Sequence, residues 1–224
     1  MASIKSYKLI RSKKRRTIAL TVAADATLIV RAPENTSIKY IEHLIVKNSE
    51  WIRKAILRLS TRPKVQKKEY ISGEGFFFLG KLHKLKIQKN IAEPLVLREN
   101  FILSEKEKGR AREVFIEWYK NEAKKKIAER VEWRAKRSGM TYKSVRITSA
   151  ERRWGSCGSN GNLSFSWRLI MAPLSVIDYV VAHEFAHLEH KNHSPAFWTT
   201  VKAMCSGYER SKDWLRENER TLTL

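Results

Sequence analysis

Residues 183–198 read HEFAHLEHKNHSPAFW, and this stretch decides how the C-terminal part of the chain folds. It opens with His183 and His187, four positions apart, and Glu184 directly follows the first histidine. The residues before it are apolar at helical spacing, which predicts a half-buried helix from about Val176 to His190. Residues four apart lie on one face of a helix, so the two imidazoles can converge on one metal ion.

His193 is the best candidate for a third ligand, because catalytic zinc sites use three protein ligands and keep a fourth position open. A continuous helix would carry the Cα atom of residue 193 about 15 Å along the axis from residue 183. The helix must therefore end before His193, and the chain must turn back. Asn192 tolerates left-handed backbone geometry and is expected to make this break. Ser194-Pro195 predicts the start of another helix, which continues to about Cys205.

Three other side chains compete for the third position. His190 shares the helical face of the first two histidines, but it lies about 10.5 Å along the axis from His183. It reaches the same ion only if the helix breaks between them, so a surface histidine at a helix C-terminus is the simpler interpretation. Glu209 and Glu217, from a later helix, could instead supply a carboxylate ligand.

The ligand chemistry favours Zn²⁺. Imidazole suits zinc, whereas magnesium and calcium prefer oxygen ligands. Glu184 can reach a water beside the ion rather than the ion itself, which makes it the expected catalytic base. Three histidines and a glutamate that merely pack would be hard to satisfy without a cation. The residues therefore predict a zinc-dependent hydrolase.

Two strands and a long helix are predicted before the metal-binding helix. Residues 145–148 and 163–169 have strand character, and Asn160-Gly161 between them is a strong hairpin signal. Ser104 opens a capping-box pattern, and an apolar stripe then continues at helical spacing to Gly139, which ends the helix.

The first 103 residues are predicted to be β-rich with one helix. Ser37 caps this helix, which extends to about Leu59. The strands are expected at residues 17–22, 27–31, 74–87 (a pair), 95–97 and 101–103. We therefore divide the chain into a β-rich N-terminal region, 1–103, and a zincin-like catalytic region, 104–224. The two are expected to form one continuous structural unit.

The charge of the chain is large and uneven. It has 45 Lys and Arg against 23 Asp and Glu, a net charge of +22. Residues 171–224 carry six basic and seven acidic residues, which leaves 39 against 16, or +23, in residues 1–170. Such a field favours polyanions, so contact with nucleic acid through residues 1–170 is expected. A lysine-rich surface that serves only solubility is the alternative.

The chain shows no sign of a membrane or secretory segment. Its first residues lack an apolar run of signal-peptide length, and no stretch approaches the roughly 20 apolar residues that span a bilayer. We therefore expect a cytoplasmic protein without membrane contact. Its two cysteines, Cys157 and Cys205, have no partner at metal-binding spacing and are expected to be free thiols.

Three runs of the sequence together resemble the YgjP-like metallopeptidase family of predicted metal-dependent hydrolases. They are RWGSC at 153–157, WRLIMAP at 167–173 and the stretch 183–198 quoted above. The family is similar to SprT-like zinc proteases, some of which cleave protein crosslinked to DNA. The resemblance implies an α+β fold, with a zincin-like active-site helix packed on a small antiparallel sheet. It also implies zinc at the three histidines and a catalytic role for Glu184.

Residues 154–157 are expected to form a sheet edge beside the metal-binding helix. An extended substrate backbone could pair there with Trp154, Gly155 and Ser156. Arg152 and Arg153 are candidates to stabilise developing negative charge, with surface charges on a loop as the alternative. Tyr208 could donate a proton to the oxyanion, or it could be a core tyrosine.

Three functions compete. The first is a metallopeptidase that acts on protein or peptide. The second is a nucleotide pyrophosphatase that acts on UTP, as some members of the family are described. The third is a nucleic-acid-associated protein with a structural zinc, which predicts salt-dependent DNA binding that survives Glu184→Gln. The intact glutamate argues against the third, because a structural site needs no base.

Overall fold

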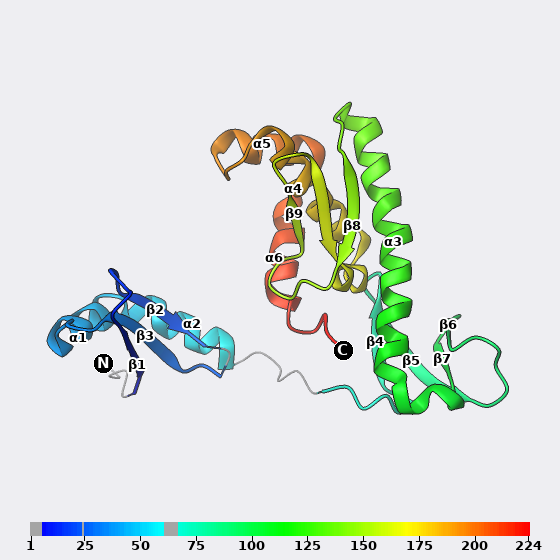
Figure 1. The fold of residues 1–224 in the computed structure, drawn as a ribbon, viewed down its shortest axis with the longest axis horizontal. Helices are drawn as coiled ribbons and strands as arrows, with labels where there is room; N and C mark the ends of the chain where they lie inside the picture. The colour runs from blue at the N-terminus through cyan, green and yellow to red at the C-terminus, as the bar shows by residue number, and fades with distance from the viewer. Residues whose placement is uncertain (1–5, 24, 61–66) are drawn as a thin grey trace. The chain divides into compact units, whose positions relative to one another are not determined.

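The computed structural model describes residues 6–23, 25–60 and 67–224, and the chain forms two compact units, Met1–Val65 and Gln66–Leu224 (Figure 1). The predicted division between residues 103 and 104 falls inside the second unit. The reason is packing, because Phe76 and Phe101 from the predicted β-rich region share one core with Phe115 of the following helix.

The first unit is a three-stranded sheet with two helices. Its elements are β1 (Lys8–Ser12), β2 (Ala19–Val22), β3 (Leu28–Pro33), α1 (Ile38–Lys47) and α2 (Ser49–Ser60). The predicted strands at 17–22 and 27–31 are present as β2 and β3, which pair antiparallel, and β1 adds a parallel strand on the other edge of β3. Ser37 caps α1 as expected, by accepting from the Tyr40 N–H. The predicted single helix is broken at Asn48, whose side chain donates to the Leu44 carbonyl.

The second unit contains two sheets and four α-helices among its described residues. Its strands are β4 (Gly75–Phe78), β5 (Lys81–Gln88), β6 (Leu95–Leu97), β7 (Phe101–Ser104), β8 (Ser144–Thr148), β9 (Gly155–Cys157) and β10 (Asn162–Ser166). Its helices are the 3₁₀ turns η1 (Glu105–Arg110) and η2 (Trp167–Met171), with α3 (Ala111–Ser138), α4 (Leu174–Glu189), α5 (Pro195–Met204) and α6 (Tyr208–Asn218). The expected α+β class is confirmed. None of the described helices is long and apolar enough to cross a membrane.

Both sheets of the second unit are mixed, not antiparallel as expected. The strand orders are β4-β5-β7-β6 and β8-β10-β9. The predicted hairpin joins β9 to β10, with Gly161 in the left-handed region at φ 80°. Residues 149–154 carry the chain across to the far edge, so β10 returns parallel to β8. The predicted strand 163–169 ends early at Ser166, because the following turn η2 buries Trp167, Leu169, Ile170 and Met171 together.

The long helix α3 begins later than predicted and ends where predicted. Ser104 makes no side-chain capping bond, and a 3₁₀ turn precedes the helix. Gly139 closes it in the left-handed conformation at φ 69°, which costs glycine little. In Figure 1, α3 passes beside β8.

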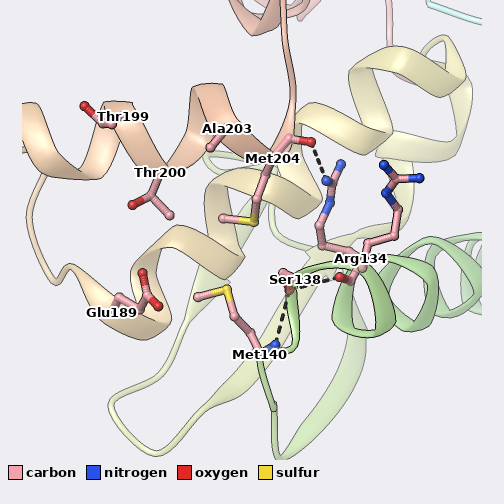
Figure 2. Close-up of a pocket in the computed structure, with 9 residues that line it drawn as sticks. Arg134, Ser138, Met140, Glu189, Thr199, Thr200, Ala203 and Met204 are labelled. Atoms are coloured by element: carbon pink, nitrogen blue, oxygen red, sulfur yellow. Dashed lines mark hydrogen bonds between the residues drawn. The ribbon is translucent and has the colours of Figure 1, made fainter.

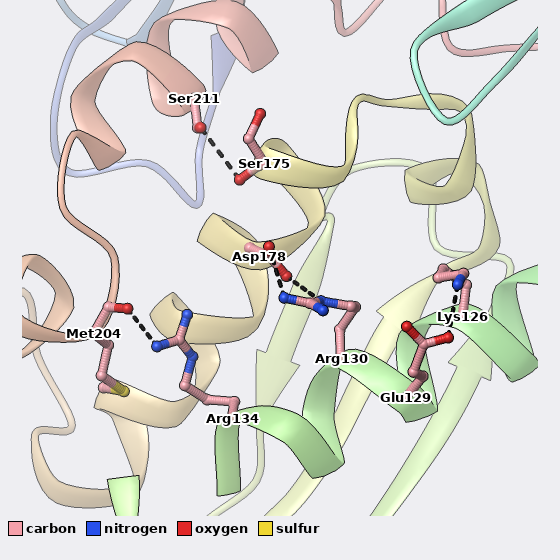
Figure 3. Close-up of polar contacts among 8 residues, drawn as sticks. All are labelled: Lys126, Glu129, Arg130, Arg134, Ser175, Asp178, Met204 and Ser211. Carbon is pink, nitrogen blue, oxygen red and sulfur yellow. Dashed lines mark hydrogen bonds and ion pairs between the residues drawn. The ribbon is translucent and has the colours of Figure 1, made fainter. Parts of the chain in front are cut away.

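Polar contacts fix α3 to α4, the helix that carries His183 and His187. The Arg130 guanidinium donates to both oxygens of Asp178, at 2.5 and 3.0 Å (Figure 3). Asp178 therefore joins α4 to α3 through an ion pair. One turn further along α3, the buried Arg134 donates to the carbonyl of Met204 at the end of α5. These two arginines tie α4 and α5 to the same helix.

The start of α4 is fixed by the turn between β4 and β5. The N–H groups of Leu79 and Gly80 donate to the carbonyls of Ile170 and Met171, at 2.9 and 3.0 Å. Gly80 has φ 79°, and a Cβ atom there would lie 2.7 Å from Cγ of Pro173. Glycine is therefore required both for the backbone angle and for the close approach.

Candidate metal centre

Helix α4 presents two histidines and a glutamate from a buried setting. It packs against α3, α5, α6 and β9, and most of its apolar residues are buried. His183 and His187 lie one turn apart, with ring centroids 5.0 Å from each other. Glu184 is 4% exposed, so this carboxyl group is held inside the protein.

The chain turns back after α4 and brings His193 to the other two imidazoles. The helix ends at Glu189, and His190 adopts an extended conformation with φ −118° and ψ 109°. Ser194 then caps α5 by accepting from the Phe197 N–H, as its sequence predicts. The expectation that Asn192 makes the break in a left-handed conformation is wrong, because its φ is not positive. The turn is made by extended backbone at His190 instead.

The three imidazoles converge. One ligand nitrogen from each of His183, His187 and His193 can be chosen so that all lie within 4.8 Å of one another. Nε2 of His183 and Nε2 of His193 are 3.1 Å apart. Two nitrogens bound to one tetrahedral zinc ion would be separated by about 3.3 Å. The geometry therefore fits a single metal ion with little movement.

The turn also orients His187, the second candidate ligand. The Nδ1 atom of His187 lies 2.9 Å from the His190 carbonyl, so it donates there and leaves Nε2 for the metal. The His190 side chain points elsewhere, with its Nε2 3.1 Å from the Thr200 hydroxyl. Among the described residues, His190, Glu209 and Glu217 are not part of the converging group. The structure thus brings His193 to the site rather than its competitors.

His183 and His193 are shifted toward the neutral form, which is the form that binds metal. Burial, with the nearby charges of His187 and His193, lowers the pKa of His183 to about 4. Burial also lowers the pKa of His193, although its side chain is exposed toward solvent. A neutral imidazole keeps the lone pair that a cation needs.

The Glu184 carboxyl group is in an unusual setting. Burial raises its pKa to about 8, and the positive charge of Arg153 opposes this rise. Its Oε2 atom is buried and has no hydrogen-bond partner among the described residues. A buried carboxylate is costly without a compensating positive charge. A cation held by the adjacent histidines would supply that charge, so the donor set fits a resident metal ion.

Gly155 on β9 leaves the space that Glu184 occupies. A Cβ atom at Gly155 would lie 2.5 Å from Oε1 of Glu184 and 2.7 Å from its Cγ. Gly155 has no positive φ, so the requirement is for space alone and not for backbone freedom. The absence of a side chain at this position therefore sets where the carboxyl group lies.

Gly155→Ala is expected to lower the hydrolytic rate by about 100-fold, because the added methyl group displaces Glu184 by an ångström or so. Zinc content should not change, since no histidine is touched. Gly109→Ala is the matched control, because a Cβ atom there meets nothing within 4 Å. Wild-type kcat in Gly155→Ala would show that the position of the Glu184 carboxyl group set by this contact does not matter for hydrolysis.

Four of the five residues predicted to bind substrate line one pocket of about 180 Å³. They are Arg153, Trp154, Gly155 and Ser156. Arg152 is exposed and is not among the lining residues. The pocket lies along β9, next to the strand position that contacts Glu184.

An aromatic cluster beside the metal centre was not predicted. The Trp198 ring stacks on His193, with centroids 5.7 Å apart, and on Tyr208, at 5.3 Å. Lys212 lies over the same indole, its Nζ 4.2 Å from the ring centroid. Tyr208 therefore contributes to this cluster and also stacks on Tyr179. The position of Trp198 could have been predicted from the sequence. It lies in the first turn of α5, which begins directly after His193, so its side chain stays close to that histidine.

A larger pocket, of about 440 Å³, lies among α3, α4 and α5. Figure 2 shows Glu189 and Thr200 across this pocket from Arg134 and Ser138. It contains none of the predicted site residues. The larger hollow is therefore separate from the metal centre.

A comparison with models of known protein families assigns the sequence to one of them. Residues 16–218 match the model of the YgjP-like, metallopeptidase domain. A search of curated proteins finds no significant match. Among solved structures, the metallopeptidase zymogen of Pyrococcus abyssi abylysin is similar, with 21% identity and a TM-score of 0.37 over 40% of this chain and 90% of that chain. The family model spans most of the sequence, and the chain belongs to the YgjP-like metallopeptidase domain family.

Proposed function

We propose that this chain is a zinc-dependent peptidase in which Glu184 is the general base. The observation that carries the proposal is the convergence of three imidazoles next to a buried, unpartnered carboxyl group. Membership of a metallopeptidase family supports metal-dependent hydrolysis. The choice of zinc rests on ligand chemistry, because three neutral imidazoles favour zinc over magnesium or calcium.

His183, His187 and His193 would hold the ion, and a bound zinc ion would supply Lewis acidity to water and to the scissile carbonyl group. Glu184 would accept a proton from the attacking water and later give it to the leaving amine. Its burial keeps bulk water from competing for that proton. The high pKa that burial gives Glu184 suits an acceptor that must also release its proton.

The edge of β9 supports an extended peptide as the substrate. The Trp154 carbonyl accepts from the Ser166 N–H, and the Gly158 N–H donates to the Asn162 carbonyl. Every second residue of this segment, 154, 156 and 158, therefore directs its backbone groups toward β10. In antiparallel pairing the intervening residues, Gly155 and Cys157, direct their backbone groups to the other edge. Among the described residues no strand occupies that edge. A substrate strand can pair there, directly beside Glu184.

Removal of the metal is expected to abolish peptide hydrolysis. Protein treated with a chelator and desalted should not cleave an unfolded protein, and one equivalent of zinc per chain should restore cleavage. The same samples should be assayed for pyrophosphate release from UTP. Zinc-restored pyrophosphate release without proteolysis would assign the site to nucleotides, and inactivity toward both would contradict a hydrolase.

A further inference from the structure

The pocket along β9 lies on the face of the sheet that points away from the core. Ser164 is opposite Ser156 on one side and opposite Arg146 on the other, so the three side chains share one face. Their neighbours Leu163 and Phe165 point the other way and are fully buried in the core. The pocket is therefore built from the polar face of the three-stranded sheet.

This pocket is positively charged and rich in hydroxyl groups. Arg146 and Arg153 line it with Ser156, Ser164 and other hydroxyl-bearing residues. The described lining residues include no aspartate or glutamate. The nearby Glu151 pairs with Arg168, at 3.2 Å, and not with either lining arginine. Within the described part of the chain, no carboxylate forms an ion pair with Arg146 or Arg153.

The strand geometry connects this pocket to the substrate. Successive side chains of a strand point to opposite faces, and directly opposed residues on paired strands share a face. A peptide paired with the free edge of β9 would therefore direct the side chain opposite Ser156 onto the pocket face. Its neighbours would point toward α4 and Glu184 instead. Arg153, just before β9, lies on the substrate side of the pocket, and Arg146 on β8 lines the same pocket from the opposite edge of the sheet.

We propose that this pocket binds the carboxylate of an aspartate or glutamate in the substrate, so that the enzyme prefers peptides with an acidic residue opposite Ser156. The proposal rests on the proposed peptidase function. A volume of about 180 Å³ accommodates a carboxylate side chain, whereas pockets for whole small molecules begin near about 300 Å³. Guanidinium groups bind carboxylates through paired, charge-assisted hydrogen bonds. Ser156 and Ser164 add hydroxyl donors, whereas Thr148 and Ser166 already donate to backbone carbonyls.

The test separates binding from cleavage. The binding of fluorescent peptides to the zinc-loaded Glu184→Gln variant would be measured. Each peptide has a neutral sequence with one glutamate, which is moved one position at a time, and a peptide with glutamine at the same position serves for comparison. One position is expected to favour glutamate by about 10- to 100-fold in Kd. Arg146→Gln and Arg153→Gln should each reduce that preference. Lys143→Gln, which removes an exposed charge outside the pocket, should leave it unchanged.

Several results would overturn the proposal. Equal binding of the glutamate and glutamine peptides at every position would do so, as would a preference that survives both arginine substitutions. Displacement of the acidic peptide by a single-stranded oligonucleotide, in a manner that depends on both arginines, would assign the pocket to phosphate. Failure of the proposed function differs, because wild-type enzyme would then bind the acidic peptide without cleaving it. Cleavage without acidic preference would refute the pocket alone.

Discussion

Glu184→Gln is expected to lower kcat for peptide hydrolysis by about 1000-fold, which is within the usual contribution of a general base. Glutamine has nearly the same shape, so the space beside Gly155 remains filled and the histidines do not move. It cannot accept the proton of the attacking water. Zinc per chain, measured by mass spectrometry, should therefore equal that of wild type. Steady-state kinetics on one peptide would give the loss in rate.

The same substitution has an expected effect on stability that verifies the burial of the carboxyl group. Burial raises the Glu184 pKa from 4.5 to about 8 in the metal-free protein. Because the folded pKa lies above the unfolded one, the wild type binds this proton more tightly when folded. That contribution is fully present below pH 4.5 and is lost as the pH rises through 8. Glutamine does not titrate, so the Glu184→Gln variant does not lose stability in this way as the pH rises.

Urea denaturation of the two metal-free proteins at pH 5 and pH 9 measures this effect. At pH 9 the Glu184→Gln variant should be more stable than wild type by a few kcal/mol. At pH 5 the difference should be much smaller, because the wild-type carboxyl group is then largely protonated in the folded state. An unchanged rate in the variant would remove Glu184 from the mechanism. A stability difference that does not depend on pH would contradict its burial.

The parts of the site that lie close together in sequence could be predicted, because helical geometry relates them directly. His183, Glu184 and His187 share one helix, and their spacing alone determines the face they occupy. The return of His193 followed from helix length, since a continuous helix could not bring it near His183. The start of the next helix at Ser194-Pro195 followed from capping chemistry.

The remaining features depend on contacts between distant segments, which periodicity does not encode. Gly155 lies against Glu184 across 29 positions of sequence, and only the coordinates reveal that a methyl group would not fit. Asn192 was expected to make the turn because its residue type tolerates left-handed geometry. His190 makes it instead, because its carbonyl accepts from His187 in the extended conformation. The preference of asparagine for left-handed backbone therefore did not decide the turn, and the hydrogen bond from His187 to the His190 carbonyl did.

The direction of strand pairing in the β8-β10-β9 sheet could not be predicted from the sequence pattern either. Residues 145–148 and 163–169 were both predicted as strands, and they contain β8 and most of β10. Their parallel pairing was not predicted, because side-chain alternation does not depend on strand direction. The predicted edge strand was nevertheless correct in position. Residues 154–157 contain β9, and their location beside α4 is what makes the substrate proposal specific.

His193→Ala is expected to weaken zinc binding by more than about 100-fold, since even outer-shell changes cost 10- to 100-fold. The two histidines of α4 would remain, but two imidazoles alone do not complete a catalytic zinc site. Hydrolysis at limiting zinc should fall to background. Metal affinity can be measured by competition with a chromophoric chelator, and His190→Ala is the matched control.

The control isolates the ligand from the turn that carries it. His190 occupies the same connection between α4 and α5, but its side chain contacts Thr200 and not the converging nitrogens. Its backbone carbonyl, which accepts from His187, survives substitution by alanine. His190→Ala should therefore keep wild-type zinc affinity. Equal zinc affinity in His193→Ala and wild type would mean that another residue completes the site, and greater loss in His190→Ala would reverse the assignment of the third ligand.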